Sequence, residues 1–206
     1  MKKESTEQKL ERIHAAAVML ASRRNVEAIS IYDVAREASI AASTVYHYYP
    51  NIEALICELM VNVFVDFDNV LDNSIKAENI HHWSDINKAI EQGFVNYYRS
   101  SSLAQHTLLG QHTYASVRFA DTENDLILGQ RVEAIYRRFF VLPELPQNIN
   151  IFAIALQVAD KVYSMDYRDN GEISDHMAEE AINLTEAYIG TYLPKNIAKN
   201  ANQEDK

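Results

Sequence analysis

The side chains best suited to chemistry lie in one short polar run. Hydroxyl groups and an imidazole follow one another between Ser43 and Tyr48. Such groups hydrogen-bond to phosphate oxygens without carrying net charge, and on an exposed helix they also reach base edges in a DNA groove. The methyl group of Ala42 suits the C5-methyl of thymine. The residues that this pattern predicts to contact DNA are Ala42, Ser43, Thr44, Tyr46, His47 and Tyr48.

A second set of candidates is aromatic and lies in the later part of the chain. Aromatic side chains at helical spacing form plain core in most proteins, but buried Tyr and Trp need partners for their polar atoms. A cavity lined by several of them would suit a small apolar or aromatic ligand with one or two polar groups. Arg99 and Arg118 could meet a ligand carboxylate or pair with nearby acids. The predicted lining residues are Phe94, Tyr98, His106, Tyr136, Phe140 and Tyr163.

The polar run requires short helices to position it. Ser30 can cap a helix, with Asp33 at the capping-box position, and apolar residues then recur at helical spacing up to Ala38. The segment 39–41 breaks that pattern before a second helix, predicted over Ala42–Tyr49 with Val45 and Tyr49 inward. Pro50 ends this helix, and Asn51 caps a third. Two short helices joined by a tight turn form a helix-turn-helix.

The run A-x-x-A-x-I-x-x-S-T-V-Y-H-Y-Y-x-x-x-E-A-L, from Ala35 to Leu55, resembles the DNA-binding signature of the tetracycline-repressor (TetR) family of transcriptional regulators. The resemblance covers about the first quarter of the chain. It implies that Ser43, Thr44 and Tyr46 face a DNA groove, while the residues near phosphate are Ser30, His47 and Tyr48. It also implies a larger helical domain that binds a small molecule and dimerises.

Three positions depart from the pattern of that family. Glycine is usual where Asn25 and Ser39 stand, and lysine is usual where Ile52 stands. Asn25 is expected to close the first helix in the left-handed region, where Asn is the next best residue. The turn at Ser39 must use a residue that tolerates positive φ less well than glycine. The missing lysine at position 52 removes a phosphate contact, which affects DNA affinity but not the fold.

Composition favours an all-helical fold. The chain has 206 residues, an apolar content of 48%, and only 5 glycines and 4 prolines. The predicted domains are a helix-turn-helix DNA-binding domain at 1–56, a helical effector-binding and dimerisation domain at 57–193, and a polar tail at 194–206. The segment 113–120 is predicted to be a loop or a short helical turn. The other predicted helices are 6–24, 51–77, one that Ser84 opens, 103–111, 122–140, 150–165 and 174–192.

The net charge of −10 is unevenly distributed. Residues 1–56 contain seven basic and seven acidic side chains, so the whole excess lies in the remainder. A neutral N-terminal module can contact phosphates locally, and such binding is strongly salt-dependent. Lys2, Lys3 and Lys9 have two open interpretations, a solvated end or phosphate contacts. No signal-peptide pattern and no membrane-length apolar run occurs, and Cys57 is the single cysteine, so a cytoplasmic protein is expected.

By the same resemblance, the last two long helices pair with their two-fold mates. Each has an apolar face with small residues that permit close helix approach. The predicted interface residues are Ile151, Ala155, Val158, Val162, Ala181, Thr185 and Tyr188.

Three hypotheses for function follow. The first is a homodimeric transcriptional regulator, a repressor of a palindromic operator that a small effector releases. The second is a helical dimer that binds a small molecule or protein and has weak or lost DNA affinity. The third, an enzyme, has no support from the sequence, because no catalytic, metal-binding or cofactor motif occurs.

Overall fold

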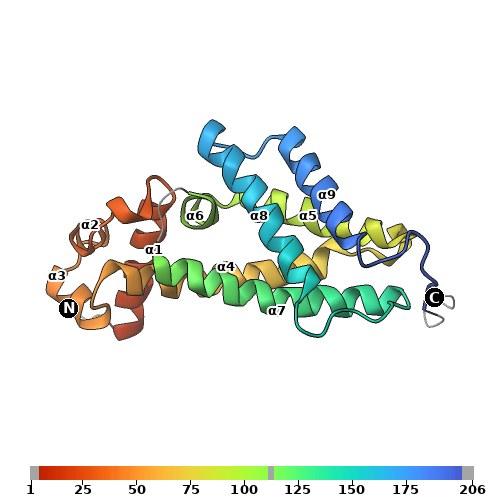
Figure 1. Ribbon diagram of the computed structural model, residues 1–206. Helices are drawn as coiled ribbons and strands as arrows, with labels where there is room; N and C mark the ends of the chain where they lie inside the picture. Colours follow the sequence, from red (N-terminus) through yellow and green to blue (C-terminus); the bar gives the residue numbers. More distant parts are fainter. Residues whose placement is uncertain (1–4, 111–113, 201–206) are drawn as a thin grey trace.

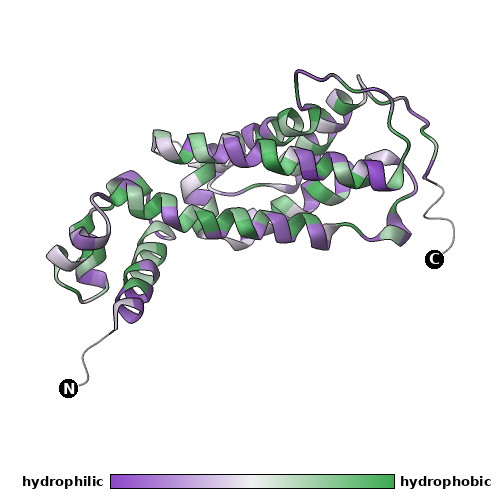
Figure 2. Cartoon of the chain, turned by 90° about the horizontal axis from the view of Figure 1, so that it is seen from below, coloured by the Kyte–Doolittle hydropathy of each residue, from purple (hydrophilic) through white to green (hydrophobic). Residues whose placement is uncertain are grey.

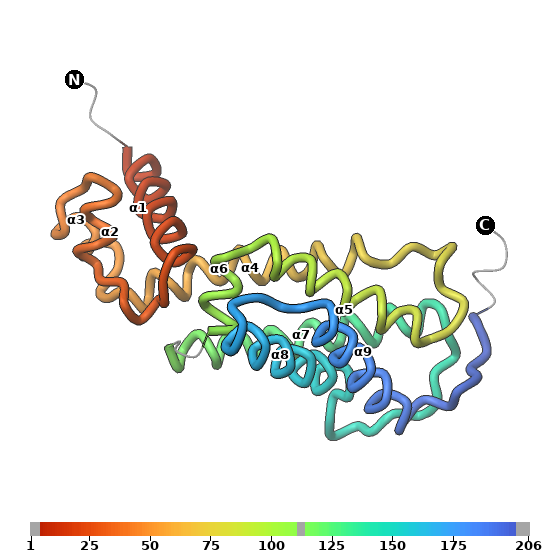
Figure 3. Tube along the Cα trace, turned by 90° about the horizontal axis from the view of Figure 1, so that it is seen from above, coloured from red at the N-terminus to blue at the C-terminus, as the bar shows by residue number. Residues whose placement is uncertain are grey.

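The protein is all-helical, as predicted. Its computed structural model describes residues 5–110 and 114–200 (Figure 1). Lys2, Lys3 and the end of the predicted tail lie outside the described residues. Within the described part, the only β-type pairing is an isolated bridge between Phe140 and Lys199. Figure 3 shows a small N-terminal group of helices at one end and a longer helical body at the other.

The N-terminal group contains three α-helices. Its elements are α1 (Thr6–Ala21), the 3-10 turn η1 (Val26–Ala28), α2 (Ile31–Glu37) and α3 (Ala42–Tyr48). Ser5 caps α1 with a capping box, since its side chain accepts from the backbone N–H of Gln8 while the Gln8 side chain accepts from the backbone N–H of Ser5. Ile13 of α1 and Val34 of α2 are fully buried and hold these helices together.

One long helix, α4 (Ile52–Ser74), is shared by both parts of the molecule. Its early buried residues, Leu55 and Leu59, belong to the N-terminal end, and Phe67 and Leu71 belong to the body. The predicted boundary at residue 56 therefore falls inside a continuous helix.

The helical body packs around α4. It comprises η2 (Ala77–Asn79), α5 (Trp83–Ser100), α6 (Ser102–Ala104), the π-helix η3 (Gln105–Leu109), α7 (Ala115–Phe139), α8 (Ile151–Asn170) and α9 (Asp175–Ile189). In Figure 1, α4 and α7 run side by side and α8 crosses over α7, while α9 packs against α8 and α5, in agreement with their contacts.

One local expectation was wrong. The segment 115–120 is the first turn and a half of α7, because Val117 packs into the core and the helix runs on unbroken to Phe139. Residues 194–200, the first part of the predicted polar tail, lie against the body. The Val141 N–H donates to the Ala198 carbonyl at 2.9 Å, and the Asn200 N–H donates to the Phe139 carbonyl at 2.9 Å.

The hydropathy pattern explains this packing. Figure 2 shows apolar and polar segments alternating along each helix, as expected for helices that bury one face. One buried cluster extends from Ile13 in the N-terminal group to Leu193 at the end of the body. None of the described helices is both long enough and apolar enough to cross a membrane.

Candidate nucleic-acid interface and effector cavity

Helix α3 presents a polar face and anchors itself by an apolar one. Val45 is fully buried and Tyr49, just after the helix, is 4% exposed, as predicted. The Tyr49 hydroxyl donates to Glu58 Oε1 at 3.0 Å, and His14 Nε2 lies 2.6 Å from the same hydroxyl. Ser43, Tyr46 and His47 are exposed. The remaining predicted contacts are partly buried, namely Ala42, Thr44 and Tyr48.

A further aromatic residue, which the sequence did not single out, borders this face. Tyr32 of α2 is 66% exposed, and its ring meets the ring of Tyr46 edge-on at a centroid distance of 6.0 Å. The two rings form an exposed aromatic pair. Tyr32 is the second residue of α2 and follows the buried Ile31, so its place on the outer face of the predicted helix was the signal that could have revealed it.

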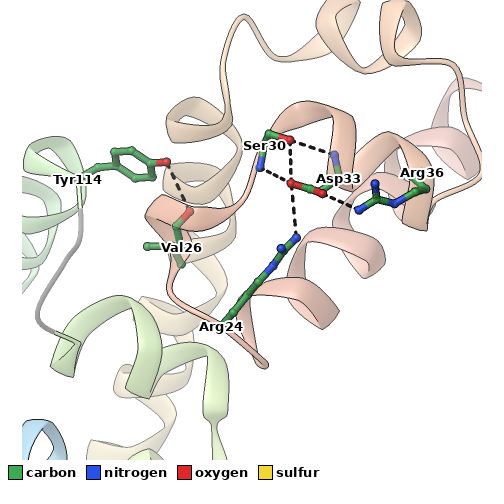
Figure 4. A network of polar contacts seen from close by, with 6 residues as sticks. All are labelled: Arg24, Val26, Ser30, Asp33, Arg36 and Tyr114. Carbon is green, nitrogen blue, oxygen red and sulfur yellow. Dashed lines mark hydrogen bonds and ion pairs between the residues drawn. The ribbon is translucent and has the colours of Figure 1, made fainter.

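Ser30, a predicted phosphate contact, is engaged in capping α2. Its hydroxyl accepts from the Asp33 N–H at 3.2 Å and donates to Asp33 Oδ2 at 2.7 Å (Figure 4). These hydrogen bonds are the main cause that lowers the pKa of Asp33 to about 2. Asp33 pairs with Arg36 at 2.6 Å and with Arg24 at 3.5 Å. The charges of these two arginines are therefore partly neutralised within the module.

Ser30→Ala is expected to destabilise the protein by about 1 kcal/mol, because the first turn of α2 loses its cap. Urea denaturation at neutral pH measures this change. Ser30→Asn is the matched control, since asparagine also caps helices and should restore most of the loss. A Ser30→Ala variant as stable as the parent chain would show that this capping network contributes nothing.

The turn between α2 and α3 has the geometry that a glycine usually provides. Ser39 has φ of +52°, in the left-handed region, as its place in the turn predicted. Arg12 of α1 donates to the carbonyl of Ser39 at 2.9 Å and also to that of Ala38, so a side chain from another helix supports the turn. Asn25 differs from expectation, because it has φ of −51° and caps η1 through the Glu27 N–H. Helix α1 has already ended at Ala21.

The start of α4 lacks the positive charge common in the resembled family. Asn51 caps the helix by accepting from the Ala54 N–H at 2.8 Å, as predicted. Ile52 is partly buried and packs against the core. This position therefore stabilises the module and offers no phosphate contact.

The body of the molecule touches the N-terminal module where α7 begins. The Tyr114 hydroxyl donates to the Val26 carbonyl at 3.5 Å, close to the capping network of α2 (Figure 4). Ser116 of α7 donates to Glu53 of α4 and accepts from Cys57 Sγ at 3.3 Å. A rearrangement of α7 would therefore reach η1 and α4 directly.

A small cavity lies between α4, α5, α7 and α8, and it collects half of the predicted effector residues. Phe94, Tyr98 and Tyr163 line it. Tyr136 is fully buried but packs on Phe152 instead, at a ring-centroid distance of 4.7 Å. The other two predicted residues lie elsewhere: the ring of His106 faces Tyr167, and Phe140 pairs with the C-terminal segment.

Acidic side chains at this cavity were missed by the sequence analysis. Glu91, Asp125 and Asp160 line it. Asp121 lies close to Asp125 and Asp160, and one carboxylate oxygen of each of these three aspartates lies within 4.8 Å of the other two. Burial is the first cause that raises the pKa of Glu91 and of Asp125 to about 8. The i, i+4 spacing of Asp121 and Asp125 was the available signal, but Glu91 and Asp160 come from other helices. Such oxygen ligands could also hold a divalent cation.

The predicted dimer residues lie mostly inside the protomer. The buried ones are Ile151, Ala155, Val162, Ala181 and Thr185. They pack α8 and α9 against each other and against their neighbours in the protomer, so they offer little surface to a second copy. Val158 and Tyr188 are partly exposed. Arg99, considered for a ligand carboxylate, pairs with Asp175 at 2.7 Å.

These features define a class of protein, a helix-turn-helix DNA-binding regulator with a helical second domain. Residues 13–59 match the family described as bacterial regulatory proteins, tetR family. The N-terminal module of the chain therefore matches the DNA-binding domain of that family.

Solved structures share the fold across nearly the whole chain. A TetR-family regulator from Streptomyces coelicolor has a TM-score of 0.70 and 17% identity, covering 90% of this chain and 99% of its own. A TetR regulator from Rhodococcus sp. RHA1 has a TM-score of 0.62 and 15% identity, covering 90% and 98%. The fatty acid degradation regulator FadR from Bacillus halodurans has a TM-score of 0.58 and 16% identity, covering 92% and 97%. No curated protein sequence matches the chain.

Proposed function

We propose that the protein is a homodimeric repressor whose two α3 helices enter successive major grooves of a palindromic operator, and that a small effector bound in the helical body releases it. The observation that carries the proposal is the polar face of α3. Ser43, Tyr46 and His47 are exposed while Val45 and Tyr49 fix the helix from behind. An exposed helix of this kind, supported by a second helix, suits the major groove.

Exposed apolar groups on α8 and α9 support pairing of two copies. Met165 is 41% exposed and Leu184 is 48% exposed, and Val158 and Tyr188 retain part of their surface. These side chains leave apolar surface exposed, which a second copy could cover. Two-fold pairing would match a palindromic site.

The position of the cavity supports release by a small effector with apolar or aromatic parts. The rings of Phe94, Tyr98 and Tyr163 border it, and Phe67 of α4 joins them. Since α4 continues into the DNA-binding module, a ligand that favours one placement of α4 also favours one placement of α3. The shift in DNA affinity is limited by the differential affinity of the effector for the two states.

Loss of single hydroxyl groups on α3 is expected to weaken operator binding. Ser43→Ala and Tyr46→Phe should each weaken it by about tenfold if the hydroxyl reaches a base edge. Tyr46→Phe keeps the ring contact with Tyr32, so it isolates the hydroxyl. The measurement is a gel shift at low and moderate salt with duplexes selected from a random library and with DNA upstream of the gene itself.

Ser100→Ala is the matched control, because Ser100 is exposed and belongs to α5, outside the N-terminal group of helices. It should leave affinity unchanged. Equal affinities for the Ser43→Ala variant and this control would remove Ser43 from the interface. Absence of any specific band at either salt concentration would refute the proposal as a whole.

A second candidate is a dimer with weak or lost DNA binding. The pairing of Arg24 and Arg36 with Asp33 favours it, as does Ile52 at the start of α4. In the same gel shift, Ile52→Lys discriminates between the two candidates. A large, salt-sensitive gain from nearly undetectable binding would support the second candidate, and a small gain on top of specific binding would support repression.

A further inference from the structure

The cavity in the helical body combines aromatic walls with acids. Four of its ten lining residues are aromatic, and they are Phe67, Phe94, Tyr98 and Tyr163. Three are acidic and come from three different helices, Glu91 from α5, Asp125 from α7 and Asp160 from α8. None of the ten is Lys, Arg or His. The cavity has a water-accessible volume of about 10 Å³, which is close to the space of one water molecule.

The hydrogen bonds recorded for these acids come from uncharged donors. The Tyr98 hydroxyl donates to Asp160 Oδ1 at 3.0 Å, and the Tyr163 hydroxyl donates to Glu91 Oε2 at 2.6 Å. The salt bridges found among the described residues involve other acids. Asp121 Oδ1 is buried without a hydrogen-bond partner among the described residues. Buried carboxyl groups without a cation are costly, and burial accordingly raises the pKa of Glu91.

A fully buried hydroxyl outside the lining of the cavity lies in the field of Glu91. Tyr136 is 0% exposed, and its hydroxyl has no hydrogen-bond partner among the described residues. Its pKa is raised by burial and then by the Glu91 carboxyl, so the hydroxyl lies in the field of that acid. A phenol oxygen can accept a hydrogen bond. The surroundings of Glu91 therefore contain an unused acceptor in addition to its carboxyl group.

We propose that this cavity binds the ammonium group of an organic amine, and that the effector of the protein is such a cation. An alkylammonium head is about the size of a water molecule and has three N–H donors, which matches three acids around a water-sized space. Aromatic faces attract the same charge by cation–π interaction. A divalent metal ion would use the aspartates but would gain nothing from the four rings. Binding of an amine in this cavity does not depend on the proposed regulatory function. The claim that the amine is the effector does rest on that function.

Direct binding tests the site without DNA. The full chain is titrated calorimetrically at pH 7 with 2-phenylethylamine and with 1,4-diaminobutane. The matched neutral and anionic compounds are 2-phenylethanol and 3-phenylpropionate, and MnCl₂ tests the metal alternative. We expect at least one amine to bind and the neutral and anionic compounds to bind at least about tenfold more weakly, since charge-assisted hydrogen bonds are the stronger ones.

Variants assign the binding to the cavity. Glu91→Gln and Asp160→Asn should each weaken amine binding about tenfold or more, while Glu123→Gln, an exposed change on α7, should not. Two isosteric variants on different helices keep the test valid if one fails to fold. Absence of binding by both amines overturns the inference, as does amine binding that survives both substitutions. Binding of Mn²⁺ alone, lost in Asp160→Asn, also overturns it in favour of a metal site.

The DNA assay separates this inference from the proposed function. An amine that binds through Glu91 and Asp160 but leaves the operator complex intact supports the site and refutes release by this ligand. Specific operator binding together with no amine binding refutes the site and leaves the regulator intact.

Discussion

Glu91→Gln is expected to be more stable than the parent chain at pH 8, by about 4 kcal/mol. Burial raises the pKa of Glu91 from 4.5 to about 8. In the unfolded chain this acid loses its proton near its ordinary pKa, but in the folded chain it keeps the proton until about pH 8. Folding stability from this group is therefore fully present below the unfolded pKa and is lost as pH rises towards 8. Each pKa unit corresponds to about 1.4 kcal/mol.

The measurement is urea denaturation at pH 5, 6.5 and 8 at a fixed protein concentration, because a dimer makes stability concentration-dependent. The parent chain should lose stability across this range, and Asp125, whose pKa is also raised to about 8, adds to the loss. Glu91→Gln should flatten the profile while keeping an acceptor for Tyr163, and Glu123→Gln should reproduce the parent slope. Parent stability that rises from pH 5 to pH 8 would show that Glu91 is ionised in the folded protein.

Gly129→Ala is expected to destabilise the protein by about 3 kcal/mol, although alanine is the better helix former by about 1 kcal/mol. Gly129 lies inside α7 where α8 begins to cross it. A Cβ atom there would lie 2.6 Å from the backbone nitrogen of Ala153 and 2.8 Å from its Cβ. Ala153 is 1% exposed, so neither helix can yield without opening the core. The clash outweighs the gain in propensity.

Urea denaturation also measures this effect, and a second substitution makes it specific. Ala153→Gly combined with Gly129→Ala should recover only part of the loss, because the contact with the backbone nitrogen remains. Gly190→Ala is the control. A Cβ atom at this helix end would come no closer than 3.0 Å to another atom, the carbonyl oxygen of Glu186. A Gly129→Ala chain that unfolds at the same urea concentration as the parent would mean that α7 and α8 are farther apart.

The local signals of the N-terminal module were strong enough to predict it. Ser30 with Asp33, Pro50 and Asn51 fix helix ends through hydrogen bonds within a few residues, and those signals can be read from the chain. The left-handed Ser39 followed from its place in the turn. The prediction for Asn25 was wrong, because its side chain caps the next turn, η1, instead of closing α1.

The cavity and the pairing surface were harder, because they depend on contacts between distant helices. Glu91 and Asp160 are 69 residues apart, and nothing near either one reveals the other. For α8 and α9, the apolar faces were found, but the sequence could not show that they are covered by α7 and α5 within one protomer. The start of α7 at Ala115 was missed because the sequence of residues 113–120, TYASVRFA, also fits the alternation of polar and apolar residues in a strand.

The length of α4 sets a scale for any signal between the two ends of the molecule. At a rise of about 1.5 Å per residue, its 23 residues extend about 35 Å. From Phe67 at the cavity to the start of the helix the axis extends about 22 Å, so a rotation of about 8° around Phe67 would carry that start sideways by about 3 Å. That displacement is close to the spacing of successive base pairs, about 3.4 Å. If two copies pair as proposed, a rearrangement of this size at Phe67 would move the two α3 helices out of register with successive major grooves.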